Sequence, residues 1–168
     1  MKLVMLGGAR NSEAQQLLAA LKQRAAELGI ETSVEFVVNA DFKTLLRYLE
    51  TAGIGIHTMW NEHFGISVVE MMAAGLITIA HGSGGPLSDI VKPHNGVKTG
   101  FVATSEEEYA AAIDAAVNML NTDAHAQMTD AARAHVQQFS DEKFSEHFLA
   151  EITANMRLQH RSSDSQHT

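Results

Sequence analysis

The segment that decides the fold spans residues 54–81 and reads IGIHTMWNEHFGISVVEMMAAGLITIAH. It begins with one apolar run, Ile54–His57, and ends with another, Leu76–Ala80. Both runs are short and rich in branched residues, as expected for parallel strands that are covered on both faces. Between them the sequence predicts a short helix over Gly65–Ala74, with Gly75 as its stop signal. This order of strand, helix and strand is typical of a βαβ unit.

Two further strands and two helices are expected before this segment. The strands are predicted at Leu3–Leu6 and Val34–Val38, where apolar residues again follow one another. A helix over Ser12–Leu28 is expected to connect them, and Asp41 is expected to cap a second helix. Because the first strand begins at the third residue, we expect the chain to be a fragment of a longer protein.

Helix-forming residues dominate the chain after a brief fifth strand near Phe101-Val102. Ser105 and Glu108 form a capping box at the start of this part. Three helices are expected there, at residues 105–120, Asp123–Gln138 and Asp141–Arg157. The remaining residues, 158–168, are mostly polar and predict a disordered tail. The sequence therefore predicts one α/β domain over residues 1–157, with a doubly wound, Rossmann-like parallel sheet and C-terminal helices.

Composition and charge exclude several classes of protein. The 168 residues include 12 Lys and Arg against 20 Asp and Glu, which gives a formal net charge of −8. Nucleic acid is therefore a poor candidate partner, because affinity for its phosphates comes largely from basic side chains. The absence of Cys excludes disulfides, thiolate zinc sites and cysteine nucleophiles. No run approaches the roughly 18 apolar residues that a membrane-spanning helix needs, so we expect a soluble chain.

The richest candidate site follows the strand at Ile54–His57. Open α/β sheets bind ligands beyond the carboxyl ends of their strands, and there the chain carries two glutamates, Glu62 and Glu70, eight positions apart. Glu62 lies before the predicted helix and Glu70 about one turn inside it, so both can face the same crevice. The first helical amides between them have no intrahelical acceptors and favour an anion such as a diphosphate.

Each glutamate also has a simpler interpretation. A single Glu near a helix start is commonly a favourable partner of the helix dipole, and a single Glu on a helix is commonly solvated. The surroundings of Glu70 favour a functional role, because it stands among four apolar residues, Val68, Val69, Met71 and Met72. We therefore expect its carboxylate to need a partner and to face the crevice rather than bulk water.

Other chemically notable residues receive structural interpretations. His57, His63 and His81 lie near strand ends, but no His-Glu-x-x-His or comparable ligand spacing occurs, so no metal site is predicted. Trp60 is interpreted as packing its loop against the sheet. The pair Gly7-Gly8 lacks the full G-x-G-x-x-G pattern, which argues against a dinucleotide site.

These residues resemble the signature of a known family. Glu62-His63-Phe64-Gly65 with Glu70, and the later pair Gly84-Gly85, are similar to the Glu-x7-Glu motif of the family 4 retaining glycosyltransferases, which have the two-domain GT-B fold. The longer strings at residues 57–66 and 80–86 resemble members that transfer mannose in asparagine-linked glycan assembly. The resemblance extends from about Leu3 to Phe148.

The resemblance implies a role for each residue of the motif. Glu62 would accept hydrogen bonds from the donor sugar, and Glu70 from the ribose of the nucleotide. The remaining positions are implied to contact the donor mainly through their backbone. They are His63, Phe64 and Gly65 at the sugar, Ile66 and Ser67 at the diphosphate, and Gly7, Gly8, Val38 and Asn39 near the base or phosphates.

The resemblance also implies what the chain lacks. The family's Arg and Lys that clamp the diphosphate would precede residue 1, as would the first strand of the nucleotide domain and an N-terminal acceptor domain. The chain would then be most of a donor-binding domain, inactive by itself. The complete enzyme would transfer mannose from GDP-mannose, in α-1,2 linkage and without a metal or cofactor, to a dolichol-linked oligosaccharide at the cytosolic face of the endoplasmic reticulum membrane.

Two alternatives stay open. The first is another nucleotide-sugar enzyme of the same architecture, with a UDP or ADP donor. The second is a non-catalytic interaction domain that kept the fold and lost the ligand, and it predicts no nucleotide binding even after the missing first strand is restored.

Overall fold

The computed structural model describes residues 1–164, and their side chains as far as residue 154. The chain forms two compact units, Met1–Thr51 (unit 1) and Ala52–Thr168 (unit 2). The expectation of a single domain over residues 1–157 stays a prediction. None of the helices within the described residues is long and apolar enough to cross a membrane.

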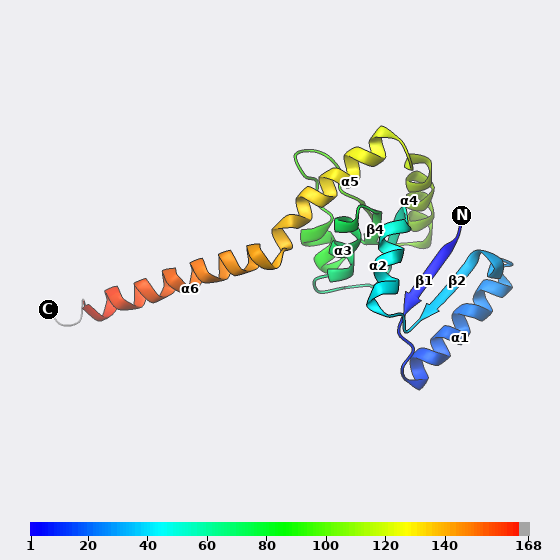
Figure 1. The fold of residues 1–168 in the computed structure, drawn as a ribbon, viewed down its shortest axis with the longest axis horizontal. Helices are drawn as coiled ribbons and strands as arrows, with labels where there is room; N and C mark the ends of the chain where they lie inside the picture. The colour runs from blue at the N-terminus through cyan, green and yellow to red at the C-terminus, as the bar shows by residue number, and fades with distance from the viewer. Residues whose placement is uncertain (165–168) are drawn as a thin grey trace. The chain divides into compact units, whose positions relative to one another are not determined.

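Unit 1 is a βαβα arrangement around two parallel strands. In Figure 1 the strands β1 and β2 run side by side in the same direction, and each residue of β1 pairs with one of β2, from Leu3 with Val34 to Gly7 with Val38. Asp41 caps the last helix as predicted, because its Oδ1 accepts a hydrogen bond from the Thr44 amide at 2.8 Å. The elements are β1 (Leu3–Gly7), α1 (Ser12–Glu27), the 3₁₀ turn η1 (Glu31–Ser33), β2 (Val34–Val38) and α2 (Phe42–Thr51).

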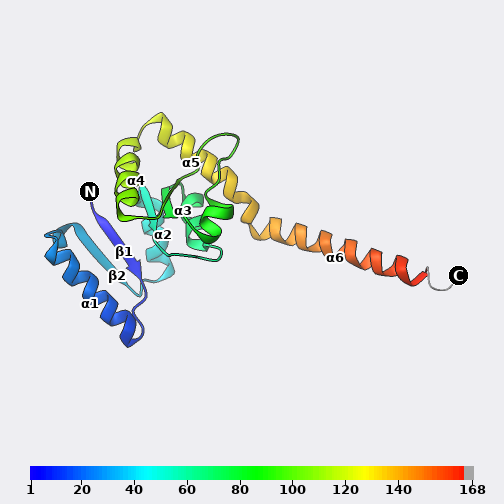
Figure 2. The same ribbon diagram turned by 180° about the vertical axis from the view of Figure 1, so that it is seen from behind.

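Unit 2 is built on a three-stranded parallel sheet of order β3-β4-β5. Helix α3 connects β3 to β4 along the chain, and the short π-type turn η2 follows β4. Figure 2 shows α3 beside α5, on which it packs. The central strand is almost completely buried, since four of its five residues are shielded from solvent. The elements are β3 (Ile54–His57), α3 (Ile66–Ala74), β4 (Ile77–His81), η2 (Pro86–Ile90) and β5 (Phe101–Ala103).

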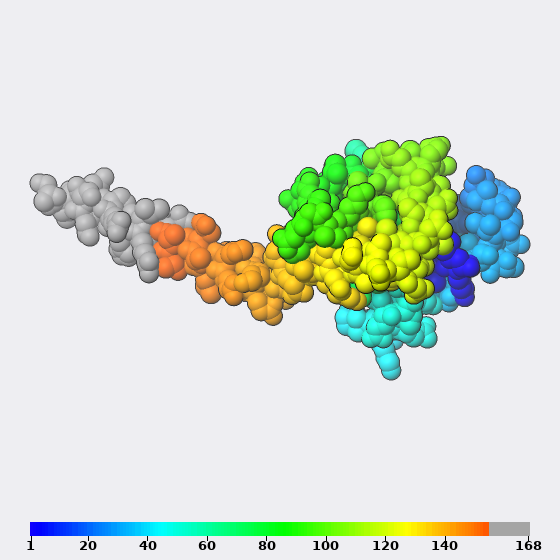
Figure 3. All heavy atoms as spheres, turned by 90° about the horizontal axis from the view of Figure 1, so that it is seen from above, coloured from blue at the N-terminus to red at the C-terminus, as the bar shows by residue number. Residues whose placement is uncertain are grey.

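Helices α4 and α5 complete the core of unit 2. Their atoms form one continuous face, yellow-green to yellow in Figure 3. One hydrophobic cluster joins α3 to α5 and includes Val68, Met72 and Ala132. A second cluster joins β4 to α4 and α5 and includes Ile77 and Ala116. The elements are α4 (Glu106–Met119), α5 (Asp123–Val136), the 3₁₀ turn η3 (Gln137–Phe139) and α6 (Asp141–Asp164).

The predicted α/β class, with parallel strands and C-terminal helices, is confirmed. All five expected strands are present, with ends that differ by at most one residue. The C-terminal tail differs, because α6 continues to Asp164 where the sequence predicts a helix ending near Arg157. Residues 158–164 contain no Pro or Gly to stop the helix. The rest of the predicted disordered tail, 165–168, lies outside the described residues.

Candidate functional site

Two loops at the carboxyl end of the unit 2 sheet are held together by backbone groups. One loop leaves β3 and the other leaves β4. The Gly85 amide donates to the Glu62 carbonyl at 2.8 Å, and the Asn61 amide donates to Ser83 Oγ at 2.8 Å. Ser83 Oγ also lies 2.8 Å from His81 Nδ1. Ser83 therefore links both loops, a role that the sequence analysis did not assign to it.

The pair Gly84-Gly85 permits this close approach. A Cβ atom at Gly84 would collide with the Glu62 carbonyl, and one at Gly85 would collide with the carbonyls of His63 and Phe64. Gly84 also has a φ of +55°, which disfavours other residues. The cluster of glycines after a strand was the feature of the sequence that pointed to this loop. In the structure these glycines support the loop that carries Glu62.

The start of α3 leaves two backbone donors without a protein acceptor among the described residues. Gly65, with a φ of +100°, caps the helix without a side-chain hydrogen bond, and its carbonyl accepts from the amides of Val68 at 2.9 Å and Val69 at 3.2 Å. The Ile66 and Ser67 amides donate to no protein acceptor in the described part of the chain. Together with the helix dipole, these amides form a suitable position for an anion, as the sequence predicts.

Glu62 is partly buried beside an imidazole. Its side chain is 25% exposed, and its Oε2 lies 3.9 Å from Nε2 of His57. His57 ends β3, and its Nδ1 is buried without a hydrogen-bond partner among the described residues. The Tyr109 hydroxyl donates to the His57 carbonyl at 3.0 Å. Burial raises the pKa of Tyr109, so this hydroxyl, which is protonated at neutral pH even in water, stays a donor.

Glu70 lies on α3, one turn after Ser67, and its side chain is exposed. Val68, Val69 and Met72 around it are buried, so the helix turns its apolar side inward and Glu70 outward. The expectation that this carboxylate needs a partner and is kept from bulk water is wrong, because the residue is exposed and an exposed carboxylate is hydrated by water. A role for Glu70 therefore depends on its position one turn after the amides of Ile66 and Ser67 on α3.

The interpretation of Trp60 is also wrong. Its side chain is 72% exposed, and that of the neighbouring Met59 is 58% exposed. The loop is held instead by the backbone contacts with Gly84 and Gly85 and by the ring of Phe64. That ring meets the Phe139 ring edge to face, with centroids 5.5 Å apart. Phe64 therefore anchors the loop through its side chain.

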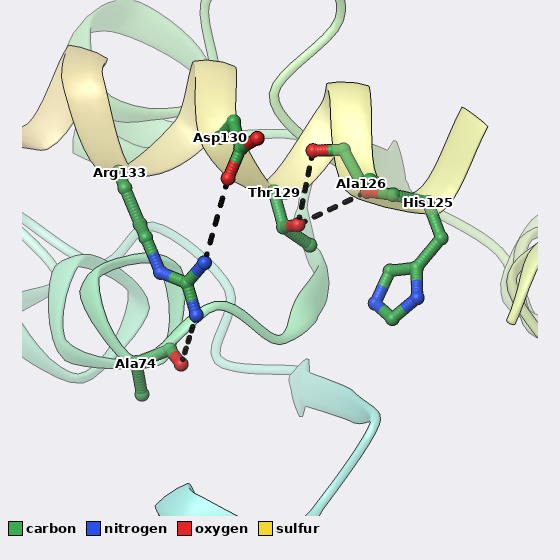
Figure 4. Close-up of polar contacts among 6 residues, drawn as sticks. All are labelled: Ala74, His125, Ala126, Thr129, Asp130 and Arg133. Carbon is green, nitrogen blue, oxygen red and sulfur yellow. Dashed lines mark hydrogen bonds and ion pairs between the residues drawn. The ribbon is translucent and has the colours of Figure 1, made fainter. Parts of the chain in front are cut away.

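The other end of α3 is fixed by Arg133 of α5. Figure 4 shows the guanidinium group reaching the last turn of α3, where its Nη2 donates to the Ala74 carbonyl at 3.0 Å. Nη1 lies 3.6 Å from Oδ1 of Asp130. A positive charge at a helix C-terminus also interacts favourably with the helix dipole. Arg133 thus holds the end of α3, while the Ile66 and Ser67 amides at its start have no acceptor among the described residues.

The candidate residues of unit 1 lie at the ends of β1 and β2. Asn39, with a φ of +54°, accepts a hydrogen bond from the Ala9 amide on its Oδ1 at 3.0 Å and donates its own amide to the Gly7 carbonyl at 2.9 Å. Gly7, Gly8 and Val38 are exposed beside it. The structure thus brings these four residues together within unit 1. Whether they border the same ligand as the α3 amides stays a prediction.

The arrangement of unit 2 suits an anion that also carries hydroxyl groups. Two carboxylates can accept hydrogen bonds from hydroxyls, and the amides between them can donate to a phosphate. Over the residues that the structure describes, no group of three or more His, Asp or Glu could hold a metal ion.

Residues 1–135 match the family described as glycosyl transferases group 1. Three curated relatives carry the name GDP-Man:Man(3)GlcNAc(2)-PP-Dol alpha-1,2-mannosyltransferase. The human protein is 48% identical over 152 residues, which is 90% of this chain and 31% of the relative. The Xenopus laevis protein is 49% identical over 89% of this chain and 30% of its own length. The Dictyostelium discoideum protein is 39% identical over 98% and 32%. The chain thus spans about a third of these relatives.

Solved structures share the fold. Anabaena HepE in complex with UDP has a TM-score of 0.75 and 26% identity, and the match covers 92% of this chain and 41% of HepE. Sucrose-phosphate synthase from Thermosynechococcus elongatus also has a TM-score of 0.75, with 19% identity, over 94% of this chain and 39% of the synthase. The second likeness concerns the fold alone.

Proposed function

Because the chain belongs to the glycosyl transferases group 1 family, we propose that it forms the donor-binding part of a retaining mannosyltransferase that uses GDP-mannose. The observation that carries the proposal is the start of α3, where the free amides of Ile66 and Ser67 lie between Glu62 and Glu70. The mannosyltransferase names of relatives up to 49% identical support the choice of sugar and nucleotide.

Each part of the donor has a chemical counterpart in this arrangement. The diphosphate receives hydrogen bonds from the amides of Ile66 and Ser67 at the positive end of the helix dipole. Glu62 accepts from hydroxyls of the mannose, and the amides of His63, Phe64 and Gly65 line the same sugar. Glu70 accepts from the ribose hydroxyls. Its exposure is compatible with this role, because a soluble nucleotide must reach it from solvent.

For unit 1, the proposal is that residues at the ends of β1 and β2 contact the base or phosphates of the donor. Gly7 and Gly8 leave the end of β1 without side chains, so a base or phosphate can approach the backbone closely. Val38 is 38% exposed and offers an apolar surface to a base. Asn39 holds this edge together through its contact with Ala9.

The chemistry is electrostatic stabilisation of a leaving nucleoside diphosphate. Amides that are already oriented stabilise the charge that develops as the sugar bond breaks, without the cost of reorienting solvent. Neither Glu62 nor Glu70 acts as the nucleophile, since both hold the donor rather than flank the scissile bond as glycosidase carboxylates do. The donor is GDP-mannose, and no metal or cofactor takes part.

The complete protein transfers this mannose in α-1,2 linkage to a dolichol-linked oligosaccharide at the cytosolic face of the endoplasmic reticulum membrane. The names of the relatives, which include the dolichol-linked acceptor, support this part of the proposal. As the resemblance to the family implies, we propose that an N-terminal acceptor domain completes the enzyme.

Calorimetric titration of the chain with GDP, UDP and ADP tests the choice of nucleotide. We expect GDP to bind most tightly, and GDP-mannose more tightly than GDP because of the added contacts of Glu62. A chimera in which the chain replaces the matching segment of the human relative is expected to retain mannosyl transfer. Absence of all nucleotide binding would contradict the proposal and favour a non-catalytic interaction domain.

A UDP-sugar donor is the second candidate. The observation that favours it is the UDP bound to Anabaena HepE, which is 26% identical to this chain and has a TM-score of 0.75. The same titration separates the two candidates, because a preference for UDP over GDP would replace the mannosyl donor with a UDP sugar.

A further inference from the structure

We propose that His57 is a positioning residue for donor-sugar recognition, which holds the carboxylate of Glu62 in the orientation that accepts the sugar hydroxyls. This inference rests on the proposed function, because it assigns Glu62 to the donor sugar. It extends that function to a residue outside the Glu-x7-Glu motif. The sequence analysis gave His57 only a loop or core role.

The two side chains form a partly buried pair. Nε2 of His57 lies 3.9 Å from Oε2 of Glu62, and the side chains are only 14% and 25% exposed. Shielding from solvent strengthens an electrostatic interaction relative to one at the surface. Within the described residues, no other side chain forms a hydrogen bond or ion pair with the Glu62 carboxylate.

The backbone of His57 is fixed within the sheet. His57 ends β3 in register with Ala80 of β4, and the Tyr109 hydroxyl donates to its carbonyl at 3.0 Å. Nδ1 is buried and has no partner among the described residues, so the Nε2 edge of the ring is its polar contact. The strand thus presents one nitrogen to the loop that carries Glu62.

The separation of the pair leaves Glu62 available to a ligand. At 3.9 Å the contact is longer than a hydrogen bond, so His57 orients the carboxylate without occupying its lone pairs. A free glutamate side chain loses much rotamer freedom when it is fixed by a ligand. Fixing it before the donor arrives lowers that cost of binding.

The neighbouring histidines do not offer the same contact. Nδ1 of His81 lies 2.8 Å from Ser83 Oγ, within the second loop. The side chain of His63 is exposed, although the residue follows Glu62 directly. The structure therefore assigns the positioning role to His57 rather than to the histidine cluster as a whole.

The test compares GDP-mannose with GDP in calorimetric titrations of the chain. His57→Phe keeps a ring but removes the polar edge, and we expect it to weaken GDP-mannose binding about 2- to 5-fold while GDP affinity stays unchanged. His57→Gln keeps a donor group and is expected to restore most of the loss. His147→Phe, at an exposed position on α6, is the matched control and is expected to change neither affinity.

A double substitution tests whether His57 acts through Glu62. In the Glu62→Gln background, His57→Phe is expected to cause no further loss of GDP-mannose affinity, because the effects of coupled residues are not additive. Additive losses, or an equal loss of GDP and GDP-mannose affinity in His57→Phe, would overturn the inference. If His57→Phe does not fold, His57→Ala carries the same comparison without added volume.

Failure of the proposed function gives a different result. A wild-type chain that binds GDP-mannose no better than GDP contradicts the sugar role of Glu62, and with it this inference. A wild-type chain that prefers GDP-mannose, together with His57 variants that keep the full preference, overturns only the role of His57.

Discussion

Gly84 decides how closely the two loops of unit 2 can approach. Its φ is +55°, and an added Cβ would meet the Glu62 carbonyl. Gly96 has a φ of +81° but no atom within 4 Å of an added Cβ. A substitution at Gly96 therefore introduces backbone strain without a collision. A comparison of substitutions at Gly84 and Gly96 therefore isolates the contribution of the contact between the loops to stability.

We expect Gly96→Ala to lower the free energy of unfolding by about 1–2 kcal/mol through left-handed strain alone. Gly84→Ala is expected to cost at least about 1 kcal/mol more, because the Glu62 loop must also move. Chemical denaturation of both variants measures the difference. Equal losses would indicate that the two loops do not depend on this contact.

Single residues also mark where the sequence could not predict the site. The positions of Glu62, Gly65 and the α3 amides follow from a strand end, a glycine and a helix start, which are local features of the chain. The exposure of Glu70 and Trp60 could not be predicted in this way. It depends on which side of α3 meets α5 and on the support of the Trp60 loop by Gly84-Gly85, and both are contacts between distant segments.

At the scale of secondary-structure elements, helix α3 positions the candidate site. Its buried side packs on α5 through Val68 and Met72, and Arg133 caps its last carbonyls through Ala74. Because the amides of the first turn move with the helix, the contacts at its end contribute to the geometry of its start.

Arg133→Met tests the cap while it keeps most of the aliphatic side chain. We expect it to lower the free energy of unfolding by about 0.5–1.5 kcal/mol, since it removes a hydrogen bond to Ala74 and a charge at the helix end. Asp130→Asn is the control, because Asp130 is 75% exposed and a surface ion pair contributes below about 0.5 kcal/mol. Denaturant midpoints that do not distinguish the two variants would contradict this role of Arg133.

The ends of the elements were predicted from local signals where such signals exist. Asp41 and Ser105 cap their helices as expected, and Gly75 ends α3 with a φ of +90°. The end of α6 was not predicted, because polar composition was taken as a sign of disorder. Residues 158–164 contain no Pro or Gly that would end the helix, and α6 continues through them.

At the scale of the whole molecule, the buried apolar residues are unevenly distributed. Among the described side chains, the buried hydrophobic residues of unit 1 are Ala9 and Ala25, and all the others lie in unit 2. Small cores support less stability. The order of strands and helices could be predicted from apolar runs, but the division into two units could not, because it depends on long-range contacts.

Hydrogen exchange measures the consequence of this distribution. We expect the paired amides of β4, which is almost fully buried, to exchange about tenfold or more slowly than those of β1 and β2. Strand β1 is exposed at three of its five residues, so local opening of unit 1 exposes little apolar surface. Equal protection of the strands of both units would contradict this prediction.

The central claim is that Glu62 and Glu70 hold different parts of one donor. Titration of Glu62→Gln and Glu70→Ala with GDP and GDP-mannose tests it most directly. We predict that Glu70→Ala weakens both ligands by about 1–3 kcal/mol, through the lost ribose contact, whereas Glu62→Gln weakens GDP-mannose alone. Unchanged affinity of Glu70→Ala for both ligands, or equal effects of Glu62→Gln on both, would contradict the account.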